Sequence, residues 1–216
     1  MPKFYAMQQL PLSISPAPAP DFDNFVAGPN AEALERVRDL ARGALSERIV
    51  YLWGAPGTGR SHLLAAAQRA NPALVIGDDV ESLDAGAQQA LFNAINAARE
   101  GGPAVLAAGR AAPAELKLRE DLRTRLAWGL VYQLTPPGDE HKARHLKALA
   151  AKRGLPLPDE VVGYLLTRLP RDLASLSAVI DLLDRHSLIK QRPVTLPLVR
   201  EALSQQPGWT PNRGSE

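Results

Sequence analysis

The stretch that decides the fold is Gly54-Ala55-Pro56-Gly57-Thr58-Gly59-Arg60-Ser61. Residues 49–53 ahead of it form a short apolar run typical of a buried strand, and residues 62–68 behind it contain strong helix formers without glycine or proline. A glycine-rich turn between a strand and a helix is the context of a phosphate-binding loop, because backbone N–H groups and the helix dipole converge there on an anion. The sequence therefore favours a nucleotide-binding loop over a plain glycine turn.

The loop departs from the usual pattern at one position. Its spacing fits Gly-x-x-x-x-Gly-Lys-[Ser/Thr], but Arg60 stands where lysine is usual. Arginine keeps the positive charge and presents it as a planar fork, so it can bind phosphate without placing a compact charge between the outer phosphates. We predict nucleotide binding, and leave hydrolysis open, for a set of residues in and just after the loop: Gly54, Gly57, Thr58, Gly59, Arg60, Ser61 and His62.

The composition is that of a globular protein. The chain has 216 residues, of which 45% are hydrophobic and 22% are charged, so it can bury one good core with room for a small second domain. No apolar run approaches the ~20 residues of a membrane span, and the N-terminus lacks the apolar core of a secretion signal. The absence of cysteine agrees with a cytoplasmic setting. A net charge of only +2 predicts weak or absent direct DNA binding.

Strands and helices alternate through the first part of the chain. Ahead of the loop we expect a helix at 31–44 with an apolar face formed by Leu34, Val37, Leu40 and Ala41. Beyond the loop we expect strands at 73–79, 103–108 and 130–134, and helices at 85–99, 114–118 and 120–127. In the 85–99 helix, Leu91, Ile95 and Ala98 are expected to face inward. This alternation predicts a parallel α/β sheet with its ligand at the carboxyl ends of the strands. The 73–79 strand ends in Asp78 and Asp79, a pattern typical of the acidic pair that holds Mg²⁺ in phosphate-loop proteins, with a strand-end turn as the alternative.

After Pro137 the sequence predicts helices alone. They fall at 139–153, 159–169, 171–189 and 195–204, separated by glycine or proline, and indicate a small helical domain. The polar residues that follow are expected to be loose. The predicted division is a peptide with a Pro/Ala linker at 1–20, a nucleotide-binding core at 21–135, a helical lid at 136–205 and a tail at 206–216.

The N-terminal segment has the features of an extended peptide. Leu10, Leu12 and Ile14 alternate, Pro11 excludes a helix, and 16–20 is a Pro/Ala spacer. Such a peptide suits a groove on another protein, although a strand tucked onto the core would have the same pattern.

Together these motifs resemble the DnaA-like branch of the AAA+ family over roughly residues 9–204. The segment 22–28 is similar to the family motif beside the nucleotide base, and 51–54 leads into the loop as it does in that branch. The segment 121–130 is similar to the arginine-finger segment and places Arg125 at the finger position. The segment 169–173 is similar to the lid segment whose arginine, here Arg171, reaches the bound phosphates.

The resemblance implies partners and a mode of action. The sequence ends before a helix-turn-helix DNA-binding domain, as expected of short relatives that promote inactivation of DnaA. Such a relative would bind DnaA and the β sliding clamp of DNA polymerase III, and a homo-oligomer is compatible with it. It would hold ADP or ATP, with or without Mg²⁺, and present Arg125 in trans to ATP on DnaA. The clamp-binding residues implied are Gln9, Leu10, Leu12 and Ile14.

Two departures from the family bear on activity. The segment between Ser61 and Asp78 has room for one helix and a turn, so we expect the sheet to lack one edge strand. Members of the family have a polar sensor residue at the end of the third strand. In this sequence that position would fall at Ala107, Ala108 or Gly109, and none of these can orient a water. Both departures weaken self-hydrolysis. Two alternatives stay open: a stand-alone AAA+ ATPase of the loader or initiator type, and an adaptor scaffold without nucleotide.

Overall fold

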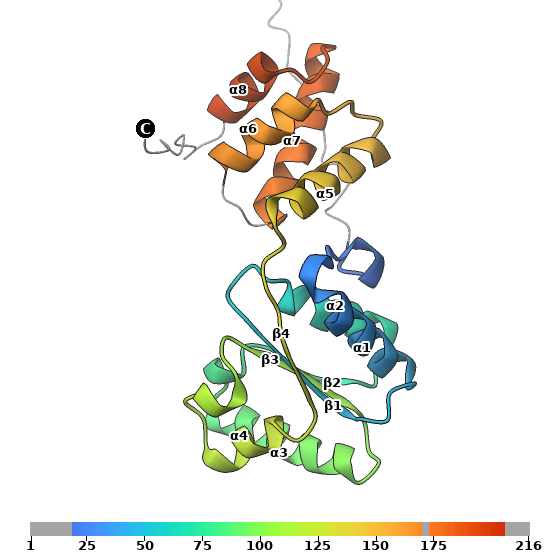
Figure 1. Ribbon diagram of the computed structural model, residues 1–216, viewed down its shortest axis with the longest axis vertical. Coiled ribbons are helices and arrows are strands. Elements are labelled where there is room, and N and C mark those ends of the chain that lie inside the picture. Colours follow the sequence, from blue (N-terminus) through green and yellow to red (C-terminus); the bar gives the residue numbers. More distant parts are fainter. Residues whose placement is uncertain (1–18, 170–172, 206–216) are drawn as a thin grey trace, which may run out of the picture. The chain divides into compact units, whose positions relative to one another are not determined.

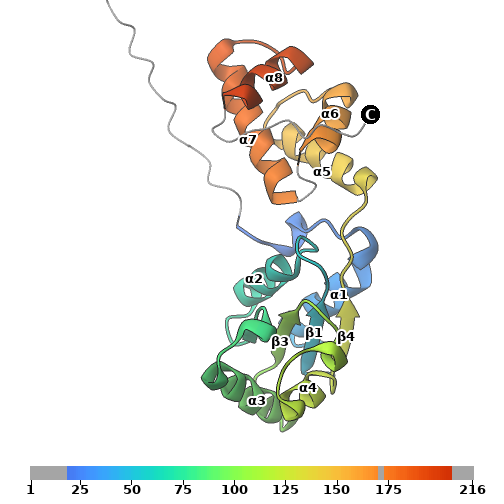
Figure 2. The ribbon, with the colours of Figure 1, turned by 90° about the vertical axis from the view of Figure 1, so that its left-hand side faces the viewer.

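The computed structural model of the chain describes residues 19–169 and 173–205 (Figures 1 and 2). Two compact units are present, one spanning Pro20–Lys142 and one containing the helices from Ala143 onward, and each is described by itself. The predicted clamp peptide and Arg171 lie outside the described residues. The predicted domain boundaries stay predictions.

The first unit contains the predicted parallel sheet, which is confirmed. Its four strands are β1 (Ile49–Trp53), β2 (Val75–Gly77), β3 (Val105–Gly109) and β4 (Leu130–Gln133), in the order β2-β3-β1-β4. All pairings are parallel, with Tyr51 opposite Ala107 and Val131. Among the described residues no fifth strand joins this sheet, as the short Ser61–Asp78 segment predicts. Parallel pairing places all four carboxyl ends at one edge.

Helices cover both faces of this sheet (Figure 1). Val50 and Leu52 pack in a core with α1 (Ala31–Arg42) and α2 (Arg60–Ala70). Ile49 and Tyr51 pack in a second core with α3 (Ala85–Arg99) and α4 (Glu120–Leu126). The alternation follows because successive side chains of a strand point to opposite faces. The inward faces predicted for the 31–44 and 85–99 helices are confirmed by the buried side chains Leu34, Val37, Leu40, Ala41, Leu91, Ile95 and Ala98.

Several predicted elements differ in extent from the structure, and for two of them the local structure gives the reason. The strand expected at 73–79 begins only at Val75, because the Asn71 side chain and carbonyl accept the N–H groups of Ala73 and Leu74 in a turn. The helix expected at 114–118 is a single 3-10 turn, η4 (Pro113–Glu115), which ends as Leu116 becomes extended. Further 3-10 turns are η1 (Phe22–Asn24), η2 (Gly28–Asn30) and η3 (Val80–Ser82).

The second unit is built from the predicted helices. They are α5 (Asp139–Lys152), which begins in the first unit, α6 (Asp159–Arg168), α7 (Leu173–Lys190) and α8 (Leu196–Ser204). Leu146, Val161, Leu165, Ile180 and Leu198 are among the fully or almost fully buried residues of one shared apolar core. Within residues 19–169 and 173–205, none of the helices has the length and apolarity needed to cross a membrane.

Candidate functional site

The glycine-rich loop follows β1 and ends where α2 begins. Gly57 and Gly59 have φ values of 81° and 96°, in the left-handed region that side-chain-bearing residues rarely adopt. At Gly59 a Cβ atom would also lie 2.5 Å from Cε2 of Phe25. Glycine is therefore required at position 59 by both the backbone conformation and the neighbouring ring.

The structure brings the predicted 22–28 motif onto the loop. The ring centroids of Phe25 and His62 are 5.6 Å apart, and His62 Nε2 lies 2.9 Å from the carbonyl oxygen of Asp21. Because that carbonyl can only accept, His62 carries its proton on Nε2 in this contact. The N-terminal motif and the start of α2 thus form one wall beside the loop.

Polar atoms inside the loop are buried without hydrogen-bond partners. Thr58 is 2% exposed and Arg60 is 8% exposed, and both Thr58 Oγ1 and Arg60 Nη1 lack a hydrogen bond. A buried polar group without a partner costs about 1–3 kcal/mol. A phosphate group is a suitable partner, since its oxygens accept hydrogen bonds from guanidinium, hydroxyl and backbone N–H groups alike. These donors and the left-handed glycines fit a nucleotide.

The two carboxylates after β2 have partners within the protein. Asp78 Oδ1 accepts the backbone N–H of Asp79 at 2.9 Å. Asp79 Oδ1 lies 3.2 Å from Arg60 Nη2 in an ion pair that lacks hydrogen-bond geometry. Asp79 itself adopts φ 41°, an unusual value for a residue other than glycine. The predicted metal residues and the predicted phosphate residue Arg60 therefore lie together at the carboxyl edge of the sheet.

The end of β3 carries no polar side chain that faces the loop. Ala107 and Ala108 are fully buried, as the sequence indicates. Nearby, Arg110 Nε lies 3.3 Å from Glu81 Oε1, and the buried Tyr51 hydroxyl donates to the Ala111 carbonyl at 2.9 Å. Burial, assisted by the charge of Glu81, raises the pKa of Tyr51, so this hydroxyl stays protonated. Among the described residues, Glu81 Oε1 is paired with Arg110, whereas Glu81 Oε2 is buried without a hydrogen bond.

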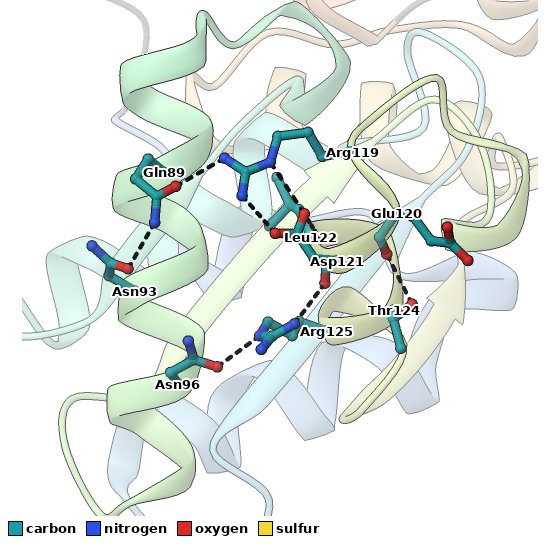
Figure 3. Close-up of polar contacts among 9 residues, drawn as sticks. All are labelled: Gln89, Asn93, Asn96, Arg119, Glu120, Asp121, Leu122, Thr124 and Arg125. Atoms are coloured by element: carbon teal, nitrogen blue, oxygen red, sulfur yellow. Dashed lines mark hydrogen bonds and ion pairs between the residues drawn. The ribbon is translucent and has the colours of Figure 1, made fainter.

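Arg125 lies on α4 and contacts four neighbours, of which Asn96 on α3 and Asp121 on α4 are drawn in Figure 3. Its Nε donates to Asn96 Oδ1 at 2.7 Å, and its Nη1 donates to the Asp121 carbonyl at 3.1 Å. Its guanidinium carbon lies 3.9 Å from the ring centroid of Phe92 and 4.9 Å from that of Trp128. We name Phe92, Asn96, Arg125 and Trp128 the Arg125 cluster. No hydrogen bond within the described part of the chain uses Nη2.

The carboxylate beside Arg125 is engaged by another arginine. Arg119 donates to both oxygens of Asp121, with Nε–Oδ1 at 3.2 Å and Nη2–Oδ2 at 2.5 Å, and its Nη1 donates to Gln89 on α3 (Figure 3). The hydrogen bond from Arg119 holds the pKa of Asp121 below its ordinary value. Arg125 donates to the backbone carbonyl of Asp121, and within the described residues it forms no ion pair with Glu120 or Asp121.

Sequence reasoning missed Phe92 and Asn96. The two residues are four apart on α3 and so lie on one helix face, with Arg99 three residues further on. Arg99 contacts the other aromatic member of the cluster, since its guanidinium carbon lies 4.4 Å from the Trp128 ring centroid. A polar and aromatic stripe beside an inward apolar face was the available signal. The contact of this stripe with Arg125 on α4 cannot be predicted from the spacing of residues within either helix.

A cavity of about 360 Å³ lies at the amino ends of β1 and β4. Arg48, Arg99 and Trp128 are among the residues that line it. Because the strands are parallel, this cavity is at the opposite edge of the sheet from the glycine-rich loop. It is therefore separate from the candidate nucleotide site.

Solved structures with a similar fold place the chain in a class. Domain III of the replication initiation protein DnaA from Thermotoga maritima has a TM-score of 0.74 at 21% identity, covering 88% of this chain and 98% of that one. AMPPCP-bound DnaA from Aquifex aeolicus has a TM-score of 0.68 at 20% identity, over 88% and 68%. The Thermotoga maritima RuvB Holliday junction branch migration motor has a TM-score of 0.64 at 14% identity, over 86% and 71%. With the parallel sheet and the glycine-rich loop, these likenesses establish an AAA+ fold.

The helical unit shows a more specific similarity than the AAA+ fold alone. Residues 139–203, from the start of α5 into α8, match the family model described as the lid domain of Hda. The helical unit is therefore similar to the Hda lid domain and the fold is similar to that of DnaA, which is consistent with the resemblance to the DnaA-like branch of AAA+ proteins seen in the sequence motifs.

Proposed function

We propose that this chain regulates the initiation of DNA replication by binding the sliding clamp and stimulating hydrolysis of ATP held by DnaA. The Hda-type lid and the DnaA-like fold support a DnaA-related replication regulator. The observation that carries the finer proposal is Arg125, whose guanidinium is held in place by the Arg125 cluster while Nη2 makes no hydrogen bond among the described residues. The proposed setting is the cytoplasm.

Arg125 would act on a nucleotide held by another chain. An arginine supplied in trans neutralises charge that develops on the transferred phosphoryl group, and contributes about 10³–10⁵ in rate in nucleotide hydrolases. The contacts of Arg125 use Nε, Nη1 and both ring neighbours, which fixes the plane of the guanidinium. Preorganisation of this kind reduces the entropy lost when the arginine meets its target. Trp128, which is 41% exposed, extends the same surface toward a partner.

The glycine-rich loop would hold ADP in this chain. The donors proposed are the backbone of the loop, Arg60 and Ser61, with His62 and Phe25 in the adjacent wall. Arg171 is proposed to reach the phosphates from the lid, on the basis of the family resemblance alone. The buried, unpartnered Thr58 Oγ1 and Arg60 Nη1 support a ligand at this point. Self-hydrolysis is not part of the proposal, because Ala107 and Ala108 offer no group to orient a water.

The N-terminal peptide would provide the contact with the clamp. Gln9, Leu10, Leu12 and Ile14 are proposed for this role on sequence pattern and resemblance alone. Gln9→Ala combined with Leu12→Ala is expected to abolish binding to the clamp, measured by surface plasmon resonance. The same variant should keep the circular dichroism and melting temperature of the unmodified protein. Undiminished clamp binding would remove this peptide from the proposal.

The function is tested by measuring ATP hydrolysis on DnaA with and without this chain. The reaction contains ATP-loaded DnaA and clamp loaded on DNA. The measured quantity is the ADP formed from the ATP on DnaA, whether it is released or stays bound. We expect conversion to require both the chain and the loaded clamp. Unchanged DnaA-bound ATP in the complete reaction would contradict the proposal. Equal conversion without the clamp would leave the action on DnaA but remove the clamp from the mechanism.

A further inference from the structure

The two carboxylates after β2, Asp78 and Asp79, have contacts within the protein that bear on the predicted metal site. Asp78 Oδ1 is used by the backbone N–H of Asp79 at 2.9 Å, and Asp79 Oδ1 is paired with Arg60 Nη2 at 3.2 Å. Among residues 19–169 and 173–205 there is no group of three or more His, Cys, Asp or Glu side chains that could hold a metal ion. Mg²⁺ in nucleotide sites is typically bound through one or two carboxylates together with phosphate oxygens. Here one oxygen of each carboxylate already has a partner within the protein.

The cation beside these carboxylates is a guanidinium. Arg60 is 8% exposed, so its charge is retained in a largely dry environment next to Asp79. The Asp79 side chain is 45% exposed, so a metal ion that reached it would lie beside the Arg60 guanidinium or displace it, and the two positive charges would repel each other. The Arg60–Asp79 pair therefore opposes a metal at this position.

Arg60 can also link the carboxylate to a phosphate. The guanidinium has five N–H donors in a fixed plane, whereas a lysine ammonium is a compact point charge. Nη2 faces Asp79, and Nη1 is buried without a hydrogen bond. The ion pair between Arg60 and Asp79 lacks hydrogen-bond geometry, so no hydrogen bond to this carboxylate oxygen fixes the guanidinium.

We propose that Arg60 takes the place of the metal, so that this loop binds nucleoside diphosphate independently of Mg²⁺. The guanidinium connects Asp79 to the phosphate oxygens through Nη2 and Nη1. This inference rests on the proposed nucleotide site, and it specifies the ligand as the metal-free diphosphate. It also explains why the position is occupied by arginine: the guanidinium presents separate, fixed donors to the phosphate and to the carboxylate, whereas a lysine ammonium is one compact charge.

The test is calorimetric titration of ADP into the full chain, once in millimolar Mg²⁺ and once in excess EDTA. We expect the two dissociation constants to agree within about twofold, well below the tenfold change that corresponds to 1.4 kcal/mol. In Arg60→Lys, which frees Asp79 from the guanidinium, we expect ADP to bind at least about tenfold more tightly with Mg²⁺ than with EDTA. Arg36→Lys is the matched control, because Arg36 pairs with Asp39 on α1, away from the loop.

The possible results distinguish failure of the Mg²⁺ independence from failure of the nucleotide site itself. ADP binding that weakens about tenfold or more in EDTA for the unmodified chain would overturn the inference and leave the nucleotide site standing. Absence of ADP binding in both buffers would overturn the nucleotide site and the inference with it. The comparison of buffers uses the unmodified protein, so it decides the question even if Arg60→Lys fails to fold.

Discussion

The glycine-rich loop and the Arg125 cluster hold their arginines in opposite ways. In the loop, Arg60 is 8% exposed, has one ion pair without hydrogen-bond geometry, and leaves Nη1 buried and unpartnered. In the cluster, Arg125 is half-buried, donates two hydrogen bonds and contacts two aromatic rings. The first arginine is incompletely satisfied by the protein, and the second is positioned by it.

This difference indicates what each region requires. A buried hydrogen-bond donor without a partner destabilises the protein. A ligand that supplies acceptors removes part of this free-energy cost, which favours its binding. A guanidinium that is already oriented needs no ligand in its own chain, and can meet a target on another protein with little further ordering. Substitutions in the loop should therefore change nucleotide affinity, while substitutions in the Arg125 cluster should change the action on a partner.

The largest expected effect is that of Arg125→Ala on the stimulation of DnaA-bound ATP hydrolysis. We expect stimulation to fall by about 10³-fold or more, because the transferred charge loses its neutralising group. ADP affinity and clamp binding should stay unchanged. The lost hydrogen bonds and ring contacts should lower the free energy of unfolding by about 1–2 kcal/mol, measured by urea titration.

Arg123→Ala is the matched control for this prediction. Arg123 lies on the same helix, and no side-chain hydrogen bond, ion pair or ring contact is formed by it within the described part of the chain. Full stimulation is expected from this variant. Loss of stimulation in Arg123→Ala with retention in Arg125→Ala would assign the finger to Arg123 instead.

A smaller effect is expected for Arg60→Ala on the affinity for ADP. Removal of a charged donor to phosphate should weaken binding by about 10- to 150-fold, which corresponds to about 1.5–3 kcal/mol. The unpaired Asp79 carboxylate would add repulsion and favour the upper end of this range. Calorimetry measures the change, with Arg36→Ala as the control. Equal affinity in Arg60→Ala would show that the loop is not the nucleotide site.

Asn96→Leu tests whether the orientation of Arg125 matters, because it removes the acceptor of Arg125 Nε and keeps the arginine. We expect maximal stimulation to fall by about tenfold, equivalent to about 1.4 kcal/mol. The concentration of this chain that gives half-maximal stimulation should not change, since Asn96 positions the arginine and does not itself bind a partner.

Two further variants distinguish positioning from a general structural role. Asn96→Asp keeps an acceptor for Nε and should restore stimulation. Asn93→Leu removes a neighbouring amide on the same helix that contacts Gln89 and not Arg125, so it should have no effect (Figure 3). A loss in Asn93→Leu equal to that in Asn96→Leu would contradict a specific role for Asn96.

The smallest effect concerns the Arg119–Asp121 pair beside the cluster. The pKa of Asp121 is lowered by its hydrogen bond from Arg119, so the pair stabilises the fold above the ordinary aspartate pKa of about 4. This stabilisation is lost as the pH falls through the lowered pKa. The melting temperature of Asp121→Asn should lie slightly below that of the unmodified chain at neutral pH, and the two should converge as the pH falls through the lowered pKa of Asp121. A constant difference at every pH would show that the charge of Asp121 is not responsible.

Local patterns predicted much of the fold and only part of the site. The glycine spacing and its flanking strand located the loop, and the apolar periodicity of residues 85–99 identified the buried Leu91, Ile95 and Ala98. The pairing of Arg60 with Asp79 was not predicted, because it depends on how α2 and β2 meet across the sheet edge. The contact of Phe92 with Arg125 likewise joins α3 to α4 through tertiary packing, which leaves no trace in the spacing of either helix.

The most direct measurement follows labelled ATP from a known starting protein in a single turnover. In one arm the label is bound to DnaA before this chain and DNA-loaded clamp are added, and in the other it is bound to this chain alone. We predict rapid hydrolysis of the label on DnaA, and no hydrolysis above background of the label on this chain. Hydrolysis of ATP bound to this chain without DnaA, together with unchanged ATP on DnaA, would contradict action in trans and identify a stand-alone ATPase.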